Sequence, residues 1–234
     1  MRPLLLGLAL LAIPPDPARA ELVLPQPDER LTQDCADCPP LVTLPDGSLI
    51  SQAPVTRAQF AVFARETGFD QPGWGCKWRA PGIAQQDDHP VVCVSFQDAT
   101  AYATWLSHHA GHAYRLPTVA EMQKAALGGQ DGPYWWGGSV GRNRANCLGC
   151  GSAFDGKGTS PVTAFAKNPY HLLDAVGNVW IWTTDCAESG CDERRLIGGS
   201  WSNPPADLRV TKTIWNGTAI PFATYGIRVL READ

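Results

Sequence analysis

The stretch 172–203 constrains the fold more than any other part of this chain, because it places three tryptophans among glycines. The run Val-Trp-Ile-Trp at 179–182 is apolar without interruption, which is typical of a strand buried on both faces. Trp201 follows Gly-Gly-Ser, and a glycine beside a large aromatic side chain lets a neighbouring segment come close. We therefore expect a compact core here, with a functional face where Ser202 and Asn203 emerge.

The first twenty residues have the three parts of a secretory signal peptide. Arg2 supplies the positive start, the apolar run LLLGLALLAI follows, and Ala-Arg-Ala at 18–20 is a cleavage site of small residues. The apolar run is shorter than a bilayer requires, so we expect cleavage after Ala20 and no membrane span. The sequence predicts a periplasmic or secreted protein.

Composition favours one acidic domain with much irregular chain. The net charge is −4, and no basic stripe or polybasic patch suggests binding to nucleic acid or to a membrane surface. The 23 glycines and 20 prolines favour short elements joined by loops, and nine tryptophans argue against disorder. We expect a signal peptide at 1–20, a proline-rich N-terminal arm at 21–40 and a single domain at 41–232.

Local signals predict three helices, each preceded by a capping residue and followed by glycine. The predicted helices run from Thr56 to about 66, from Ser95 to about 109 and from Thr118 to Gly128. Short strands are predicted at 41–44, 91–96 and 225–230, with a hairpin turn at 45–47. Three histidines (His108, His109 and His112) fall around the expected end of the second helix, and we interpret them as a solvated helix end rather than a metal site.

The eight cysteines predict structural disulfides, because an exported protein folds in an oxidising compartment. We expect Cys76–Cys93 and Cys186–Cys191 to close loops. The two Cys-x-x-Cys elements, at Cys35/Cys38 and Cys147/Cys150, can close on themselves or pair with each other. Four thiolates on zinc and a thioredoxin-like redox motif are less favoured alternatives, because the spacing and the surrounding elements do not match those sites.

Several segments together resemble the sulfatase-modifying factor, or formylglycine-generating enzyme, family. They are RLPTVAEMQKAALGG at 115–129, TSPVTAFAKNPYHLLDAVGNVWIWTTDC at 159–186, RLIGGSWSN at 195–203 and YGIRVLRE at 225–232. NCLGCGSAFD and HPVVCVSF further resemble a bacterial, exported subgroup that is rich in cysteine. The resemblance covers about 41–231 and implies an α+β fold, a variant of the C-type lectin fold with sparse secondary structure and bound calcium.

The chain departs from the family where its enzymes carry two copper-binding cysteines after Gly-Gly-Ser. Those positions fall on Asn203 and Leu208. A soft copper ion requires thiolates, so we expect neither copper nor formylglycine-generating activity. The iron-binding helical domain of the related sulfoxide synthases is also absent from this sequence.

The resemblance also implies two calcium sites. The first would use Asn146, the carbonyl of Cys147 and Asp155, which are hard oxygen ligands of the kind that calcium prefers. In the alternative interpretation, Asn146 and Asp155 cap turns in a glycine-rich loop.

A second calcium site would use Asp174 with the carbonyls of Gly177 and Val179. The family places a glutamate at the position of Ile181, which cannot ligate a cation. We therefore favour the first site over the second, and Asp174 can instead cap a turn.

The chain keeps the motifs of the family's scaffold but lacks the copper cysteines, which favours a binding or maturation-accessory module. We expect a cleft lined by aromatic and arginine side chains to hold an unidentified peptide, protein or small molecule. The residues expected there are Ser200, Trp201, Asn203, Arg209 and Arg228. The alternative is an oxidoreductase, because some members of the family act as oxidoreductases in siderophore maturation without sulfatase activity.

Overall fold

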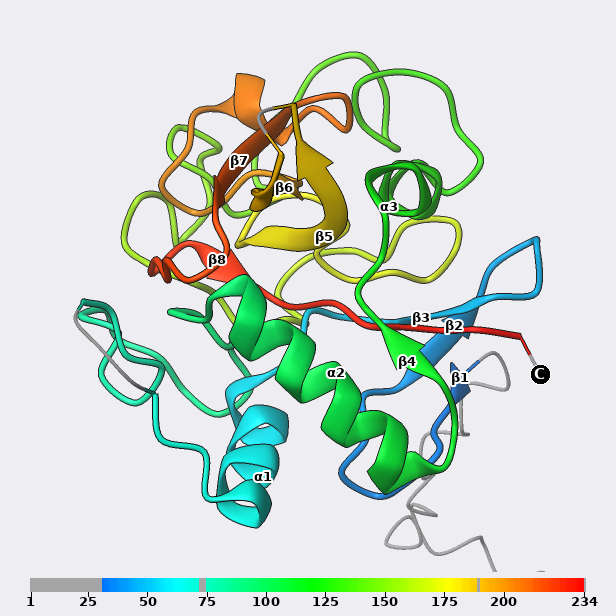
Figure 1. Ribbon diagram of the computed structural model, residues 1–234. Coiled ribbons are helices and arrows are strands. Elements are labelled where there is room, and N and C mark those ends of the chain that lie inside the picture. Colours follow the sequence, from blue (N-terminus) through cyan, green and yellow to red (C-terminus); the bar gives the residue numbers. More distant parts are fainter. Residues whose placement is uncertain (1–30, 72–74, 189, 234) are drawn as a thin grey trace, which may run out of the picture.

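The computed structural model describes residues 31–71, 75–188 and 190–233 (Figure 1). The expected signal peptide at 1–20 and the first ten residues of the expected N-terminal arm lie outside these ranges. The described residues form two small β-sheets, three α-helices and one short 3-10 helix, joined by long irregular segments. This agrees with the predicted α+β class and with the high content of glycine and proline.

The first sheet brings the two ends of the described chain together (Figure 1). Its strands lie in the order β1–β2–β3–β9–β4, and every neighbouring pair is antiparallel. The predicted hairpin turn joins β2 to β3, with Gly47 at a φ of 86° and the Asp46 carboxylate accepting the Ser48 amide. The strands are β1 (Leu31–Thr32), β2 (Leu41–Thr43), β3 (Leu49–Ser51), β4 (Tyr114–Arg115) and β9 (Leu230–Arg231). Since β1 comes from the expected arm, that part of the arm belongs to the sheet.

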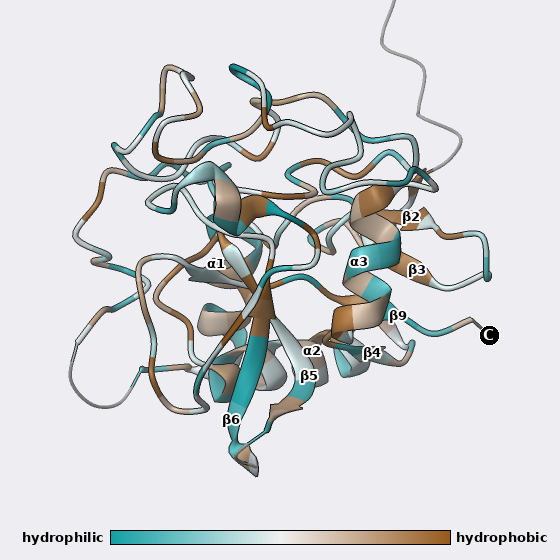
Figure 2. Ribbon diagram, turned by 90° about the horizontal axis from the view of Figure 1, so that it is seen from above, coloured by the Kyte–Doolittle hydropathy of each residue, from teal (hydrophilic) through white to brown (hydrophobic). Residues whose placement is uncertain are grey.

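The second sheet has the order β7–β6–β5–β8, with β5 parallel to β8 and antiparallel to β6. Its strands are β5 (Trp180–Ala187), β6 (Gly190–Ile197), β7 (Thr213–Gly217) and β8 (Tyr225–Gly226). As predicted, β5 begins with both faces buried. Trp180 and Trp182 pack into one hydrophobic cluster with α1 and α2, whereas Val179 and Ile181 pack into a second cluster with α3. β6 changes from hydrophilic at its start to hydrophobic at its end, where it enters the core (Figure 2).

The three helices form where their capping signals predict them. They are α1 (Arg57–Thr67), α2 (Phe96–Ala110) and α3 (Val119–Leu127). Each begins with a complete capping box, formed by Thr56 with Gln59, Ser95 with Asp98 and Thr118 with Glu121. Each ends at a left-handed glycine, namely Gly68, Gly111 and Gly128. α1 and α2 lie side by side, joined by ring contacts such as Phe60 with Tyr102 (Figure 1).

Two strand predictions need correction. The segment 91–96 forms no strand, although Val91, Val92 and Val94 are fully buried. It runs through the core without a neighbouring strand to pair with, and the amide of Val91 bonds to the Val55 carbonyl instead. The predicted strand 225–230 is interrupted, because β8 belongs to one sheet and β9 to the other. The three residues between them cross from sheet to sheet.

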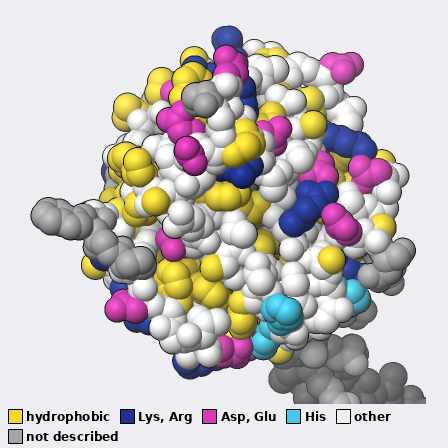
Figure 3. Space-filling view, in the orientation of Figure 1, with side chains coloured by type: hydrophobic (Ala, Val, Ile, Leu, Met, Phe, Trp, Pro, Cys, Tyr) yellow, Lys and Arg dark blue, Asp and Glu magenta, His cyan; other side chains and the backbone are white. Residues whose placement is uncertain are grey.

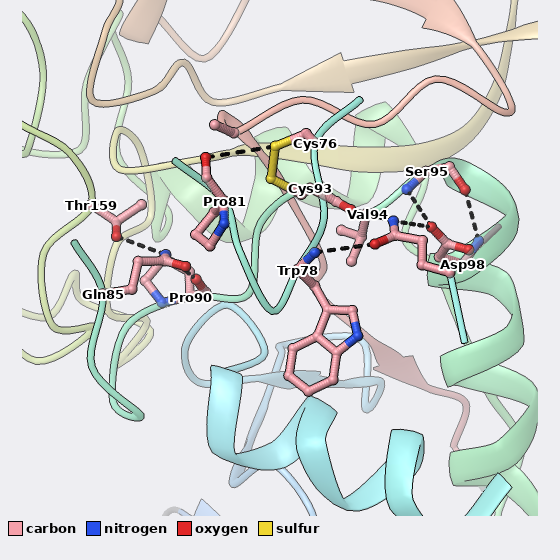
Figure 4. The surroundings of a disulfide bond; sticks show 12 residues. Cys76, Trp78, Pro81, Gln85, Pro90, Cys93, Val94, Ser95, Asp98 and Thr159 are labelled. Atoms are coloured by element: carbon pink, nitrogen blue, oxygen red, sulfur yellow. Dashed lines mark hydrogen bonds between the residues drawn. A yellow bond between two sulfur atoms is a disulfide. The ribbon is translucent and has the colours of Figure 1, made fainter. Parts of the chain in front are cut away.

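All eight cysteines form local disulfides. Cys76–Cys93, shown in Figure 4, and Cys186–Cys191 confirm the two predicted loop closures. Cys35–Cys38 and Cys147–Cys150 show that each Cys-x-x-Cys element closes on itself, so cross-pairing does not occur. In the described ranges, no helix has the length and apolar character needed to cross a membrane.

Candidate functional site

The turn after β6 is the part of the structure where the expected functional face lies. Gly199 has a φ of 74°, and a Cβ built there would lie 2.7 Å from the Leu208 side chain and 2.9 Å from the Asp207 carbonyl oxygen. Only glycine therefore lets this turn pack against the 3-10 helix η1 (Pro205–Leu208). The close approach brings Asn203 beside the buried start of β5.

Four side chains form a closed hydrogen-bonded group that we call the Asn203 network: Asn203, Ser200, Trp180 and Asp207. Asn203 Oδ1 accepts from Trp180 Nε1 at 2.9 Å and from the Ser200 hydroxyl. Asn203 Nδ2 donates to Asp207 Oδ2 at 3.0 Å. The backbone carbonyl of Asn203 also accepts from the amide of Leu148, within the Cys147–Cys150 loop, at 2.9 Å. The network holds Asn203 in one orientation and presents no soft ligand to a metal.

Leu208 lies in the core and does not reach the surface. Its side chain is fully buried in the second hydrophobic cluster. It packs so closely that a Cβ on Gly177 or Gly199 would come within 3.2 Å of it. The two positions where the family carries copper cysteines therefore hold a hydrogen-bonded amide and a core aliphatic side chain.

The structure brings only part of the expected cleft together. Ser200, Trp201 and Asn203 share one turn, with Ser200 fully buried and Trp201 half-buried and bonded through Nε1 to the Ala223 carbonyl. Arg209 follows η1 and is exposed. Arg228 does not lie with them, because it is fully buried in the segment between β8 and β9.

The Arg228 guanidinium is held by backbone carbonyls. Nη1 donates to the Ser51 carbonyl at 2.6 Å, and Nη2 donates to the carbonyls of Leu173 and Asp174. Burial lowers the pKa of Arg228 to about 10, which leaves it a cation at neutral pH. Its arrangement is that of a structural arginine that ties three segments together.

None of the five expected cleft residues lines either of two surface pockets that the described residues form. The first is an apolar pocket of about 820 Å³ between α1 and α2, and hydrophobic side chains gather over this region (Figure 3). The second has a volume of about 500 Å³ and lies between residues 84–89 and 153–159. The turn that carries Ser200, Trp201 and Asn203 therefore lies outside both pockets.

Among the residues expected at the first calcium site, Asn146 is fully buried. Its Nδ2 donates to the Gly158 carbonyl at 2.9 Å and to Asn178 Oδ1 at 3.2 Å, whereas its Oδ1 is buried with no hydrogen-bond partner among the described residues. Asp155 accepts the amides of Gly149 and Gly151 at 2.6 Å each, and these bonds keep its pKa below the usual value. The carboxylate therefore caps the loop that the Cys147–Cys150 disulfide closes.

At the second expected site, Asp174 is almost completely buried. Its Oδ2 accepts from Asn178 Nδ2 at 2.7 Å, and its Oδ1 is buried with no partner in the part of the chain that the structure describes. Burial raises the pKa of Asp174 to about 7. The Gly177 carbonyl accepts from the amide of Val179 at 2.7 Å. Within the described ranges, no three His, Cys, Asp or Glu side chains gather as a metal cluster.

Asn178 joins the two expected calcium sites, and the sequence reasoning missed it. It is fully buried at a φ of 63°, a conformation that asparagine tolerates better than most residues. Its side chain bonds to Asn146, to Asp174 and to the backbone of Ser160. The Gly-Asn dipeptide at 177–178, between two apolar runs, was the available signal.

Comparison with known proteins gives a consistent result. Residues 24–233 match the family model described as "Sulfatase-modifying factor enzyme 1-like domain". The formylglycine-generating enzyme of Thermomonospora curvata is 36% identical over 185 residues, which cover 58% of this chain and 59% of that enzyme. The Bos taurus protein named "Inactive C-alpha-formylglycine-generating enzyme 2" is 41% identical over 139 residues, covering 53% of this chain and 44% of that protein. The matched regions thus span less than two thirds of these curated relatives.

A solved structure extends the similarity over nearly a whole chain. The structure of PvdO from Pseudomonas aeruginosa is 26% identical in sequence and superposes with a TM-score of 0.77. The match covers 86% of this chain and 97% of that chain.

Proposed function

This chain belongs to the family of sulfatase-modifying factor enzyme 1-like domains, and we propose that it is a binding or maturation-accessory module that does not generate formylglycine. One observation carries the proposal: no thiolate is available for copper. Asn203 is held in the Asn203 network, Leu208 is buried in the core, and all eight cysteines are paired in disulfides. A soft copper ion then has no suitable ligand at the position where the family's enzymes hold it.

The module is exported in this proposal, and it acts in the periplasm or outside the cell. Four disulfides support that location, because such bonds persist in oxidising compartments. The ligand is a peptide, a protein or a small molecule. The exposed side chains on the turns next to the Asn203 network, such as Ser202 and Arg209, are the surface it would contact.

A copper and thiol assay tests this function. We expect purified protein incubated with copper to retain no stoichiometric metal, and to form no aldehyde on a cysteine peptide that the Thermomonospora curvata enzyme converts. We also expect no titratable thiol in the unreduced, denatured protein, because all cysteines are paired. Aldehyde formation, stoichiometric copper or iron, or an oxygen-consuming thiol would overturn the proposal and favour the alternative, an oxidoreductase acting on a peptide or small molecule.

We also propose that the domain binds calcium through Asn146, the Cys147 carbonyl and Asp155. The fit is supported by the buried and unpartnered Oδ1 of Asn146, since a buried carbonyl oxygen is costly unless a donor or a cation satisfies it. The unpartnered Oδ1 of Asp174 supports a second site with Gly177 and Val179 in the same way. Calcium would supply stability to the glycine-rich loop rather than reaction chemistry.

Thermal unfolding tests the first calcium site. Saturating calcium is expected to raise the stability of the wild type by about 3 kcal/mol at one hundred times Kd, which is several degrees in Tm. In Asp155→Ala we expect this calcium-dependent difference to shrink by the contribution of the first site, whereas the exposed control Asp131→Ala should keep it in full. If Asp155→Ala loses the same stability in calcium as in chelator, Asp155 is only a loop cap.

A further inference from the structure

The pocket between residues 84–89 and 153–159 combines a buried histidine with a lysine and an aromatic side chain. Its volume of about 500 Å³ lies in the range of small-molecule sites. Its walls are Ala84, Gln85, Gln86, His89, Ala153, Phe154, Lys157, Gly158 and Thr159. No acidic side chain lines it, and none of its residues belongs to the Asn203 network.

A chain of hydrogen bonds behind this pocket starts at Arg57. Its Nη1 donates to Gln85 Oε1 at 3.2 Å, and because a guanidinium has only donors, the oxygen of the Gln85 amide must face it. The amide nitrogen then faces the other way. Gln85 Nε2 donates to the Pro90 carbonyl at 2.9 Å and to Thr159 Oγ1 at 2.8 Å (Figure 4).

The next contact in the chain joins Thr159 to His89. Thr159 Oγ1 lies 2.9 Å from His89 Nδ1 and already accepts from Gln85. A hydroxyl has a single proton to donate, and His89 Nδ1 is the one acceptor found for it in the described part of the chain. The arrangement that uses the Thr159 proton within the described residues has it donated to Nδ1, and in that arrangement the neutral imidazole carries its own proton on Nε2.

The Nε2–H of His89 has no protein partner within the described ranges, yet His89 lines the pocket. The imidazole stays neutral near pH 7, because burial lowers its pKa and the charge of Arg57 adds to that effect, while Asp88 opposes it. Asp88 is exposed and is not part of the pocket wall. With the proton on Nε2, His89 brings to the pocket wall a hydrogen-bond donor for which the described residues provide no acceptor.

Lys157 adds a positive charge to the same pocket. Its ammonium group uses one of its three protons on the Ala153 carbonyl at 3.0 Å, and its side chain is otherwise exposed. Phe154 and the two alanines supply apolar wall. A neutral donor together with a cation matches a carboxylate, whose oxygens accept hydrogen bonds and carry the opposite charge.

We propose that this pocket binds a small carboxylate, with His89 Nε2–H and Lys157 holding its oxygens and Phe154 contacting its apolar part. The site is separate from the Asn203 network and goes beyond the proposed function. It adjoins the first calcium site through the bond from Asn146 to the Gly158 carbonyl, so the binding experiment is run both with calcium and with chelator. Its outcome does not depend on whether formylglycine is formed.

Nitrogen-15 NMR of the histidine rings tests the tautomer and the binding together. In the free protein at pH 7.5, we expect His89 to be protonated at Nε2 and unprotonated at Nδ1. Sodium phenylacetate should shift the Nε2–H signal to saturation at millimolar concentration, acetate should do so more weakly, and neutral phenylacetamide should not.

Two pairs of variants assign the contacts. Lys157→Gln should weaken phenylacetate binding about threefold, as expected for an ion pair at a solvent-facing position, while the exposed control Lys212→Gln should bind like the wild type. Thr159→Val should release the fixed tautomer and weaken binding about tenfold, whereas Thr163→Val, which lies outside the pocket, should change neither.

The proposal is overturned if His89 carries its proton on Nδ1. It is also overturned if neither phenylacetate nor acetate gives a saturable shift, if phenylacetamide binds as well as phenylacetate, or if Lys212→Gln weakens binding as much as Lys157→Gln. Because Lys157 is exposed, its replacement leaves the fold intact even if Thr159→Val does not fold.

Discussion

Replacing Arg228 by methionine is expected to lower the free energy of unfolding by about 3–5 kcal/mol. The methionine fills much of the same volume but donates no hydrogen bond. The carbonyls of Ser51, Leu173 and Asp174 would each lose their donor in the dry interior. Arg228 also ties together three segments that are far apart in the sequence, so its loss affects both sheets rather than one loop.

Urea denaturation of wild type, Arg228→Met and Arg209→Met measures this effect. Arg209 is exposed, so its replacement should change stability by less than about 0.5 kcal/mol. If the two variants lose the same free energy of unfolding, Arg228 is not a structural arginine. It would then again be a candidate for binding a ligand in the cleft.

The calcium-free protein is expected to lose about 3 kcal/mol of stability through Asp174 as the pH rises from about 4 to 7. Burial raises the pKa of Asp174 from 3.8 to about 7 in the folded protein. Between these values the folded state holds a proton that the unfolded state has released, so increasing pH favours unfolding. Bound calcium would oppose this loss, because a cation stabilises the ionised carboxylate.

Denaturation in chelator at several pH values, with wild type and Asp174→Asn, measures this contribution. Asparagine does not titrate, so the difference between the two stability curves should grow with pH across this window. The difference is needed because other groups act with the opposite sign. The lowered pKa values of Glu121 and His89 cost stability as the pH falls. Parallel curves for Asp174→Asn and wild type would contradict the prediction, and Asp131→Asn serves as the exposed control.

The helices could be predicted well because their signals are local. A capping box joins residues three apart, and the terminating glycine lies directly after the last turn. Ser95 and Asp98 form the same pair of bonds that the sequence suggests, and Gly111 ends α2 as expected. None of these features depends on what the helix later packs against.

The segment 91–96 shows that a local pattern can predict burial without predicting a strand. Its unbroken run of apolar residues indicates burial, and burial is what the structure has. Whether a buried extended segment becomes a strand depends on a partner strand, which comes from elsewhere in the chain. The amide of Val91 donates to the Val55 carbonyl instead, and the segment forms no ladder of strand hydrogen bonds.

The candidate site likewise has features that the sequence predicts and features that only the structure shows. The absence of cysteines at Asn203 and Leu208 could be read from the sequence, and so could the family. That Trp180 and Ser200 hold the Asn203 side chain, and that Leu208 is a core residue, could not be read there.

The sequence by itself determined the family, the α+β class, the helix ends and the two longer disulfide loops, because these depend on short motifs and on neighbouring residues. Only the tertiary structure decided that each Cys-x-x-Cys element closes on itself, that Arg228 is buried and that His89 and Lys157 line one pocket. The bond from Arg228 to Ser51 spans 177 positions, and that from Thr159 to His89 spans 70. The environment of a side chain at such separations depends on how the whole chain packs, which no local pattern specifies.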